Sequence, residues 1–219
     1  MGLTIYGVLR SRTSRPVWLA KELGLAFERV PVVQAYRLPR PEAPDAPLNT
    51  GSPAFRAVNP NGRIPSIDDD GFVLHESFAI TLYLACKHGG PLAPRDARET
   101  GLASMWSLWA ATRCEPHALA VLERYPAASK DQDPVAAAAA VDALRAPFDV
   151  LEAALQDGGG FAVGGRFTVA DINLAEVFRY AQPASELFAA NPTVARWLAA
   201  CQSRPAFRDM MLERDAEPV

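Results

Sequence analysis

The chain has 219 residues, of which 49% are hydrophobic and 21% are charged, and its formal net charge is −3. This is enough chain for one large or two small domains with a buried core. The slight acidity gives no electrostatic basis for binding nucleic acid. No apolar run approaches the length of a membrane span, and the N-terminus lacks a signal-peptide pattern. We therefore expect a cytoplasmic globular protein with no nucleic-acid or membrane partner.

The three cysteines, Cys86, Cys114 and Cys201, are widely spaced, and none forms a C-x-x-C pair. This usage is typical of a reducing compartment and argues against a disulfide scaffold, a zinc site or a dithiol redox pair. All three fall in predicted helices. We expect them to be buried and expect no bound metal.

The N-terminal residues predict a β-α-β unit. Residues 3–8 and 27–33 are short apolar runs that read as strands, and a helix is expected between them from Ser14 to Gly24. Ser14 is an N-cap residue type, and Pro16 falls in the first turn, where its missing N–H is harmless. Two strands joined by a helix should run parallel with a right-handed crossover.

The next segment, residues 36–52, is rich in proline and predicts a long surface loop. Proline blocks both helix and strand pairing, and five prolines fall here or just beyond. They are Pro39, Pro41, Pro44, Pro47 and Pro53. Residues 54–58 predict one irregular helical turn.

Residues 58–84 contain the most informative pattern of the chain, V-N-P-N-G-R-I-P-S-I-D-D-D-G-F-V-L-H-E-S-F-A-I-T-L-Y-L. Asn-Gly and Asp-Gly are strong turn signals, and the short apolar runs on either side of Gly71 predict a hairpin. A helix is expected to begin at Glu76-Ser77. Pro65 stands at the start of a strand and has no N–H with which to donate a hydrogen bond to a neighbouring strand. A cis Ile64-Pro65 bond would turn the chain sharply there.

After Pro94 the composition changes to alanine-rich helices. One long helix is expected from Arg95 to Glu123, kinked at Pro116, and a second from Pro134 to Gln156. Pro147 lies within the second, which is either kinked or restarted at that point. Two further helices, 191–201 and 205–212, are expected at the end of the chain.

Between these helices, G-G-R-F-T-V-A-D-I at 164–172 predicts a helix start. Thr168 and Asp171 have the spacing of a capping box, and Phe167 and Ile172 occupy the two staple positions. We interpret Asp171 as a folding element and expect Asp171→Ala to cost about 1–2 kcal/mol.

The 59–77 pattern resembles the glutathione-binding core of the glutathione S-transferase superfamily, N-P-x-G-x-[VI]-P-x-[LI] followed by a hairpin and E-S. The 164–172 pattern resembles that superfamily's C-terminal helix cap, G-x-x-[FL]-[ST]-x-A-D-[IL]. The resemblance is to a cytosolic, bacterial-like member with a serine-type site. It implies an α+β fold: a thioredoxin-like β-α-β-α-β-β-α domain (1–86), a linker (87–94) and an all-helical domain (95–219). The proline-rich segment departs from the family pattern, whose link there is shorter.

The chemistry implied by the resemblance is attack by the thiolate of glutathione on a small hydrophobic electrophile. A hydroxyl that donates a hydrogen bond to sulfur near a helix N-terminus stabilises the thiolate and lowers the pKa of the thiol. Tyr6, Ser11, Thr13 and Ser14 compete for this role. The R-S-x-x-S-x-x-V spacing resembles the serine-type classes and favours Ser11, with Thr13 and Tyr6 as alternatives and Ser14 as a plain N-cap.

The resemblance also implies the glutathione-binding residues. Ser77 and Glu76 would hold the γ-glutamyl end at a helix N-terminus, and Ile64 with Pro65 would present main chain to the cysteinyl part. The electrophile is expected against Met105, Trp106, Trp109 and Arg113, which follow one face of the long helix.

Three further expectations accompany this interpretation. Glutathione is the co-substrate, no metal is involved, and the protein is a homodimer by resemblance alone. The alternatives are a glutathione-dependent isomerase of the maleylacetoacetate isomerase type and a non-catalytic glutathione-binding or stress protein. Arg12 and Thr13 replace the Ser-Cys of that isomerase class.

Overall fold

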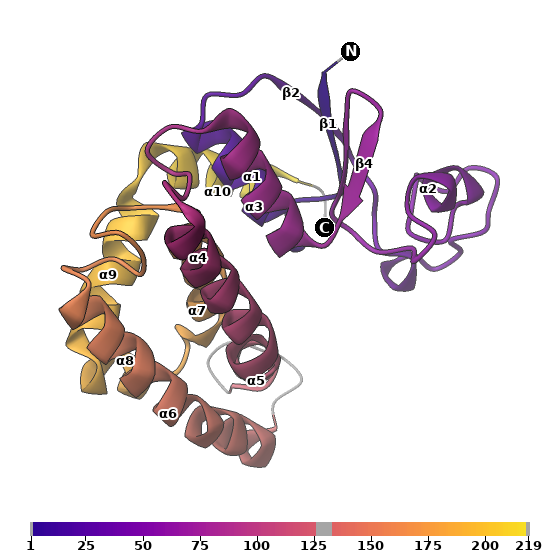
Figure 1. Ribbon diagram of the computed structural model, residues 1–219. Coiled ribbons are helices and arrows are strands. Elements are labelled where there is room, and N and C mark those ends of the chain that lie inside the picture. The colour runs from indigo at the N-terminus through magenta and orange to yellow at the C-terminus, as the bar shows by residue number, and fades with distance from the viewer. Residues whose placement is uncertain (1, 126–132, 218–219) are drawn as a thin grey trace. The chain divides into compact units, whose positions relative to one another are not determined.

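The computed structural model describes residues 2–125 and 133–217, and they form two compact units (Figure 1). The first contains the chain up to His88 together with the last helix, α10 (Pro205–Ala216). The second runs from Gly89 to Arg204. The contacts of α10 thus place it with the N-terminal unit. The domain division expected from the sequence placed the same residues in the helical domain, 95–219.

The first unit is built on a four-stranded mixed sheet in the order β2-β1-β3-β4. The central strand β1 (Leu3–Tyr6) pairs parallel with β2 (Phe27–Val30) and antiparallel with β3 (Ser66–Asp69). β3 in turn forms the hairpin with β4 (Phe72–His75). The predicted parallel β-α-β unit and the predicted hairpin are both confirmed, although β2 ends before Val33.

Two helices, α1 (Ser14–Glu22) and α3 (Ser77–His88), lie side by side in this unit (Figure 1). Their apolar residues form its core with the inward residues of β1 and β3, because alternate strand residues face the same side. The fully buried members include Ile5, Val17, Trp18, Leu19, Ile67, Ile80 and Leu84. α10 packs on α1, with the ring of Phe207 centred 4.8 Å from that of Trp18.

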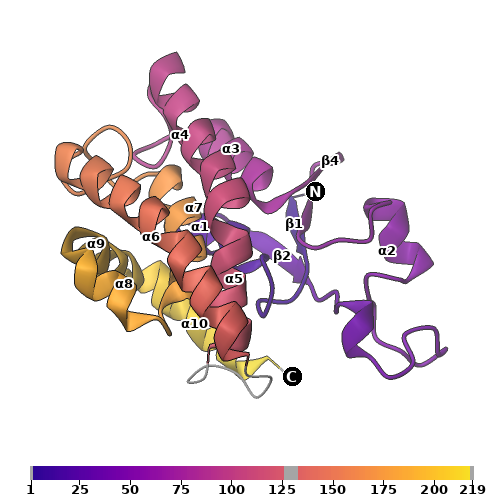
Figure 2. The same cartoon turned by 90° about the horizontal axis from the view of Figure 1, so that it is seen from below.

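The proline-rich segment leaves the sheet together with α2 (Pro53–Val58), as both views show (Figures 1 and 2). It contains a short 3-10 helix, η1 (Ala35–Arg37), and is held by Asn49, which is 1% exposed. The Asn49 amide donates to the carbonyls of Pro41 and Pro47 at 2.9 and 3.0 Å. A buried amide thus provides donors for two proline carbonyls, in a segment where the prolines themselves have no backbone N–H to donate.

In the second unit the expected long helix is divided. α4 (Ala97–Trp109) leads into a π-helical turn, η2 (Ala110–Cys114), and then into α5 (Glu115–Arg124). Pro116 stands in the first turn of α5, where the N–H it lacks is not needed. α6 (Pro134–Asp157) continues through Pro147 as one helix. The alternative of a restart at Pro147 is therefore wrong.

The centre of the helical unit is α7 (Val169–Phe178), in which every residue is buried. The predicted capping box is present at its start. A 3-10 turn, η3 (Arg179–Ala181), follows, then α8 (Ser185–Ala190), which the sequence analysis did not identify, and α9 (Pro192–Ser203). Phe178, the last residue of α7, packs its ring against those of Phe148 of α6 and Trp197 of α9.

None of the helices in residues 2–125 and 133–217 is long and apolar enough to cross a membrane. Cys114 and Cys201 are buried as expected, and burial raises the pKa of the Cys114 thiol to about 12. Cys86 is exposed, so the expectation for that residue is wrong. It lies on α3, on the side turned away from the sheet core.

Candidate functional site

The four residues expected to bind glutathione line one pocket. Ile64 and Pro65 come from the turn before β3, and Glu76 and Ser77 from the junction of β4 with α3. The pocket has a volume of about 230 Å³. Arg12, Asn59 and Arg63 also line it, so two cations that can attract an anionic ligand border the site.

The start of α3 forms one end of this pocket. Glu76 has a φ of 69°, a left-handed conformation that is unusual for a residue with a Cβ. Such strain recurs at ligand sites, where the surrounding structure holds it. The turn makes Ser77 the first residue of α3, and Ser77 is 5% exposed. The first backbone N–H groups of a helix have no partner within the helix, so this end favours a carboxylate.

Arg15 lies behind Ser77 and was missed by the sequence analysis. Arg15 belongs to the first turn of α1 and is 1% exposed, and its guanidinium donates from Nη1 to Ser77 Oγ at 2.9 Å. The guanidinium carbon lies 4.3 Å from the centre of the Phe78 ring, within cation–π range. No local signal identifies this arginine, because its partner is 62 residues away in the chain.

Asn59 shapes the other end of the pocket. It is 1% exposed, and its amide donates to the Arg63 carbonyl at 2.8 Å and to Ser66 Oγ at 3.1 Å. Its carbonyl oxygen accepts from the backbone N–H of Asn61 at 3.0 Å. One side chain thus holds the whole turn that precedes β3. The bond between Ile64 and Pro65 in this turn is cis, as predicted.

Ser11 lies in the tight turn between β1 and α1, next to Arg12 of the pocket. Its hydroxyl donates to the Val8 carbonyl at 2.6 Å and accepts from the Thr13 backbone N–H at 3.1 Å. It also lies 2.9 Å from Thr13 Oγ1. Ser11 is half-buried, so its oxygen has partial access from outside the core.

The three competing hydroxyls are placed differently. Thr13 is fully buried, and a Cβ built on Gly7 would meet its Oγ1 at 2.1 Å, so the hydroxyl points at the Gly7 backbone. Ser14 is fully buried and donates to the Ser11 carbonyl at 3.2 Å. The Tyr6 ring packs near Phe55 with its pKa raised, first by burial and then by Asp68 and Glu28. A raised pKa opposes the formation of tyrosinate.

The residues expected to contact the electrophile lie on α4 and in the π-helical turn. Trp106 is buried and packs edge-on against Trp109 with ring centres 5.1 Å apart. Trp109 in turn stacks on Phe178 at 6.2 Å. Met105 and Arg113 are exposed. The two tryptophans therefore take part in the core of the helical unit, and contact with an electrophile stays a prediction for all four.

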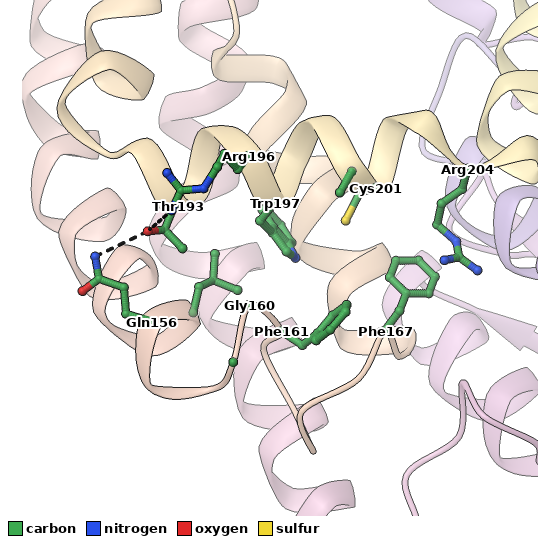
Figure 3. Close-up of a pocket in the computed structure, with 12 residues that line it drawn as sticks. Gln156, Gly160, Phe161, Phe167, Thr193, Arg196, Trp197, Cys201 and Arg204 are labelled. Atoms are coloured by element: carbon green, nitrogen blue, oxygen red, sulfur yellow. Dashed lines mark hydrogen bonds between the residues drawn. The ribbon is translucent and has the colours of Figure 1, made fainter.

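A larger pocket, of about 590 Å³, lies within the helical unit (Figure 3). Phe161 and Phe167 from the loop after α6 face Trp197 and Cys201 of α9 across it, and the Arg204 guanidinium carbon lies 3.8 Å from the centre of the Phe167 ring. None of the predicted site residues lines it. We assign the site to the smaller pocket, because that one combines a helix N-terminus, strained backbone and bordering cations.

Within residues 2–125 and 133–217 there is no cluster of three or more His, Cys, Asp or Glu side chains that could hold a metal ion.

Comparison with known families identifies both units. Residues 11–87 match the model of the glutathione S-transferase N-terminal domain, and residues 134–200 match that of the C-terminal domain. The chain belongs to the glutathione S-transferase superfamily. The N-terminal match covers Ser11 and all the residues that line the smaller pocket.

Individual relatives align over nearly the whole chain. Glutathione S-transferase 3 of Zea mays is 31% identical, over 94% of this chain and 91% of its own. Among solved structures, glutathione transferase F7 of Populus trichocarpa is 27% identical with a TM-score of 0.80, covering 97% of this chain and 99% of its own. The theta-class glutathione S-transferase of Xanthomonas axonopodis pv. citri, solved with glutathione bound, is 28% identical with a TM-score of 0.70, covering 95% and 97%.

Proposed function

We propose that this protein is a glutathione transferase that binds glutathione in the pocket at the start of α3 and presents its thiolate to a small hydrophobic electrophile. The observation that carries the proposal is the convergence of Ile64, Pro65, Glu76 and Ser77 on one pocket that Arg12, the neighbour of Ser11, also borders. Membership of the superfamily and the glutathione-bound Xanthomonas relative support it.

In this mechanism the γ-glutamyl end of glutathione is bound first. Its carboxylate accepts from the Ser77 hydroxyl and backbone N–H, and the carboxylate of Glu76 pairs with its ammonium group. The backbone of Ile64, preceding Pro65, bonds to the cysteinyl part in the manner of an added strand. The tripeptide then runs towards the turn between β1 and α1.

Ser11 acts on the sulfur. Its hydroxyl rotates away from the Val8 carbonyl and donates to the thiolate instead, which stabilises the charged form and lowers the pKa of the thiol. The nearby N-terminus of α1 favours the same charge. Of the four hydroxyls, Ser11 fits this role best because Thr13 and Ser14 are fully buried.

The thiolate then attacks an electrophilic carbon of the substrate and forms the C–S bond of a thioether. In a substitution the leaving group departs with its bonding electrons, and in an addition to an activated double bond the resulting carbanion takes a proton from water. We assign electrophile contact to Met105, Trp106, Trp109 and Arg113, and place the protein in the cytoplasm with a role in detoxification.

The test is a glutathione titration that follows thiolate absorbance in the wild-type protein and in Ser11→Ala. The proposal predicts binding with the thiol pKa lowered by about one unit or more, and Ser11→Ala is expected to bind glutathione without that shift. Tyr6→Phe serves as the control, since it removes a competing hydroxyl and keeps the ring that packs near Phe55. Binding without a shift in the wild type would mean a glutathione-holding protein, and no binding would refute the proposal.

We further propose that the protein is a homodimer. Three apolar residues of α4, Leu102, Met105 and Leu108, are 43%, 47% and 66% exposed. Their spacing of three places them along one side of the helix. An apolar row of this kind on a surface helix is typical of an association surface.

A further inference from the structure

Arg15 and Ser77 meet beneath the pocket at the start of α3. Arg15 Nη1 donates to Ser77 Oγ at 2.9 Å, and both side chains are buried. A guanidinium has five N–H donors and no acceptor, so Ser77 can only be the acceptor in this bond. The chemistry of the two groups therefore fixes the direction of this hydrogen bond.

This direction determines what the Ser77 hydroxyl can do next. A serine hydroxyl has one proton and two lone pairs, and Arg15 occupies a lone pair. Arg15 Nη1 is the one hydrogen-bond partner of Ser77 Oγ among the residues that the structure describes. The hydroxyl proton is thus left for a group in the pocket that Ser77 lines. A charged donor behind the oxygen also polarises the O–H bond and strengthens its donation.

We propose that Arg15 is a positioning residue that makes Ser77 a dedicated hydrogen-bond donor to the γ-glutamyl carboxylate of glutathione. This rests on the proposed function. Without Arg15 the Ser77 hydroxyl is free to rotate and to donate elsewhere, for example to a backbone carbonyl, as Thr81 does to that of Phe78 within the same helix. The carboxylate would then lose a charge-assisted hydrogen bond although Ser77 is still present.

Arg15 also links the two parts of the site. It belongs to the first turn of α1, and its backbone N–H donates to the Arg12 carbonyl at 3.2 Å, within the turn that contains Ser11. Its side chain reaches the first residue of α3. One residue therefore connects the turn expected to hold the sulfur with the helix end expected to hold the carboxylate.

The test compares two tripeptides by calorimetry in the full-length protein. One is glutathione, and the other is 4-aminobutyryl-cysteinylglycine, which has a hydrogen in place of the γ-glutamyl α-carboxylate. In Arg15→Met the affinity for glutathione should fall about tenfold, while the affinity for the analogue changes by less than about twofold. A merely structural role would weaken both tripeptides by the same factor, and that result would overturn the proposal.

The Ser77→Ala background supplies the second readout. If Arg15 acts through Ser77, adding Arg15→Met to Ser77→Ala should weaken glutathione binding by less than about twofold more. Additive losses would contradict the proposal. Should Arg15→Met fail to fold, Arg15→Gln, which keeps a polar group in the buried position, takes its place with the same outcomes.

The same data separate this proposal from the function on which it rests. If the wild-type protein binds neither tripeptide, the proposed function fails and the role of Arg15 fails with it. If it binds both tripeptides with equal affinity, the carboxylate makes no contribution, and the assignment of Arg15 is wrong while glutathione binding stands.

Discussion

The Asp171 carboxylate is fully buried and accepts four hydrogen bonds. Oδ1 accepts from the Ala162 backbone N–H and from Trp197 Nε1, both at 3.0 Å. Oδ2 accepts from the backbone N–H and the hydroxyl of Thr168 at 2.9 and 3.1 Å. Burial raises the pKa of Asp171, while the four donors act in the opposite direction. Asp171 therefore ties the preceding loop and α9 to the start of α7, which is more than a helix cap.

We expect Asp171→Ala to lower the free energy of unfolding by about 3 kcal/mol, more than the loss of a cap alone, because the Ala162 N–H and Trp197 Nε1 lose their acceptor in the core. Urea denaturation measures this. The control is Asp149→Ala on the exposed side of α6, which should change stability by less than about 0.5 kcal/mol. Equal stabilities for the two variants would show that Asp171 is not a folding element.

A second residue-scale feature is the bidentate pair between Glu99 and Arg166. Arg166 donates from Nη1 and Nη2 to the two carboxylate oxygens at 2.8 and 2.7 Å. Hydrogen bonds from Arg166, and then from the Arg95 backbone, lower the pKa of Glu99 from 4.5 to about 2. Because the pKa of Glu99 is lower in the folded protein than in the unfolded chain, ionised Glu99 stabilises the folded state. This stabilisation is fully present above about pH 4.5, the pKa of the unfolded chain, and is lost as the pH falls towards 2, the pKa in the folded protein.

Glu99→Gln should therefore destabilise the protein at neutral pH by about 1–2 kcal/mol. The difference from the wild type should shrink as the pH falls from 4.5 towards 2, because the wild-type carboxylate becomes protonated over that range. Denaturation curves at a series of pH values measure the difference. A gap that stays constant with pH would contradict the assignment.

At the scale of elements, α10 is the helix whose position the local sequence predicts least. Its Phe207 is 6% exposed and packs on Trp18 of α1, while Leu212 on the same helix is 71% exposed. Phe207→Ala should cost about 3–4 kcal/mol of unfolding free energy. Leu212→Ala should cost less than about 0.5 kcal/mol, since Leu212 is exposed and alanine is the better helix former. Thermal melts that shift equally in both variants would mean that α10 is not packed against α1.

The residue after α10, Glu217, connects the end of the chain to the turn that contains Ser11. Its carboxylate accepts from the backbone N–H of Leu9 at 2.7 Å and of Arg10 at 3.4 Å, and pairs with Arg29. The C-terminal end of the chain thus holds one side of the proposed thiolate site.

We expect Glu217→Ala to speed hydrogen exchange at the Leu9 amide by about tenfold, because that N–H loses a charge-assisted acceptor. The measurement is hydrogen–deuterium exchange followed by NMR or mass spectrometry. The control is Glu213→Ala in the last turn of α10, which removes a surface ion pair with Lys21 and should leave the exchange of Leu9 unchanged. If the Leu9 amide exchanges at the same rate in the wild type, Glu217→Ala and Glu213→Ala, Glu217 does not hold the turn.

At the scale of the whole molecule, the proposed dimer is testable by light scattering on the eluting protein. Leu108→Glu places a charge on the exposed apolar row of α4 and should shift the protein towards the monomer. Val150→Glu on α6, where the valine is 49% exposed, is the matched control and should leave the mass unchanged. A monomeric wild type, or a dimer unaffected by Leu108→Glu, would remove α4 from the interface.

Much of the fold and part of the site follow from local patterns in the sequence. Turn signals and short apolar runs identified the hairpin of β3 and β4, and the position of Pro16 identified the start of α1, because these preferences act within a few residues. The predicted N-cap was wrong: Ser14 is the first residue of α1, and Thr13 precedes it without a side-chain capping bond. The capping box at Thr168 and Asp171 is equally local. The pocket residues from Ile64 to Ser77 were identified because they lie in one continuous stretch with a recognisable spacing.

What the tertiary structure decided involves partners far apart in the chain. The contact of Arg15 with Ser77, the tether of Glu217 to the turn of Ser11 and the packing of α10 on α1 join segments separated by 62 to 208 residues. The sequence also left open whether the helix continues through Pro147. In the structure α6 stays intact there, because Leu144, Phe148 and Leu151 on either side of the proline are buried in the core. By itself the sequence determined which elements form and which stretch carries the site. Only folding determined which side chains meet there, because hydrogen bonds and burial depend on neighbours in space, whereas turns, caps and helix starts depend on neighbours in sequence.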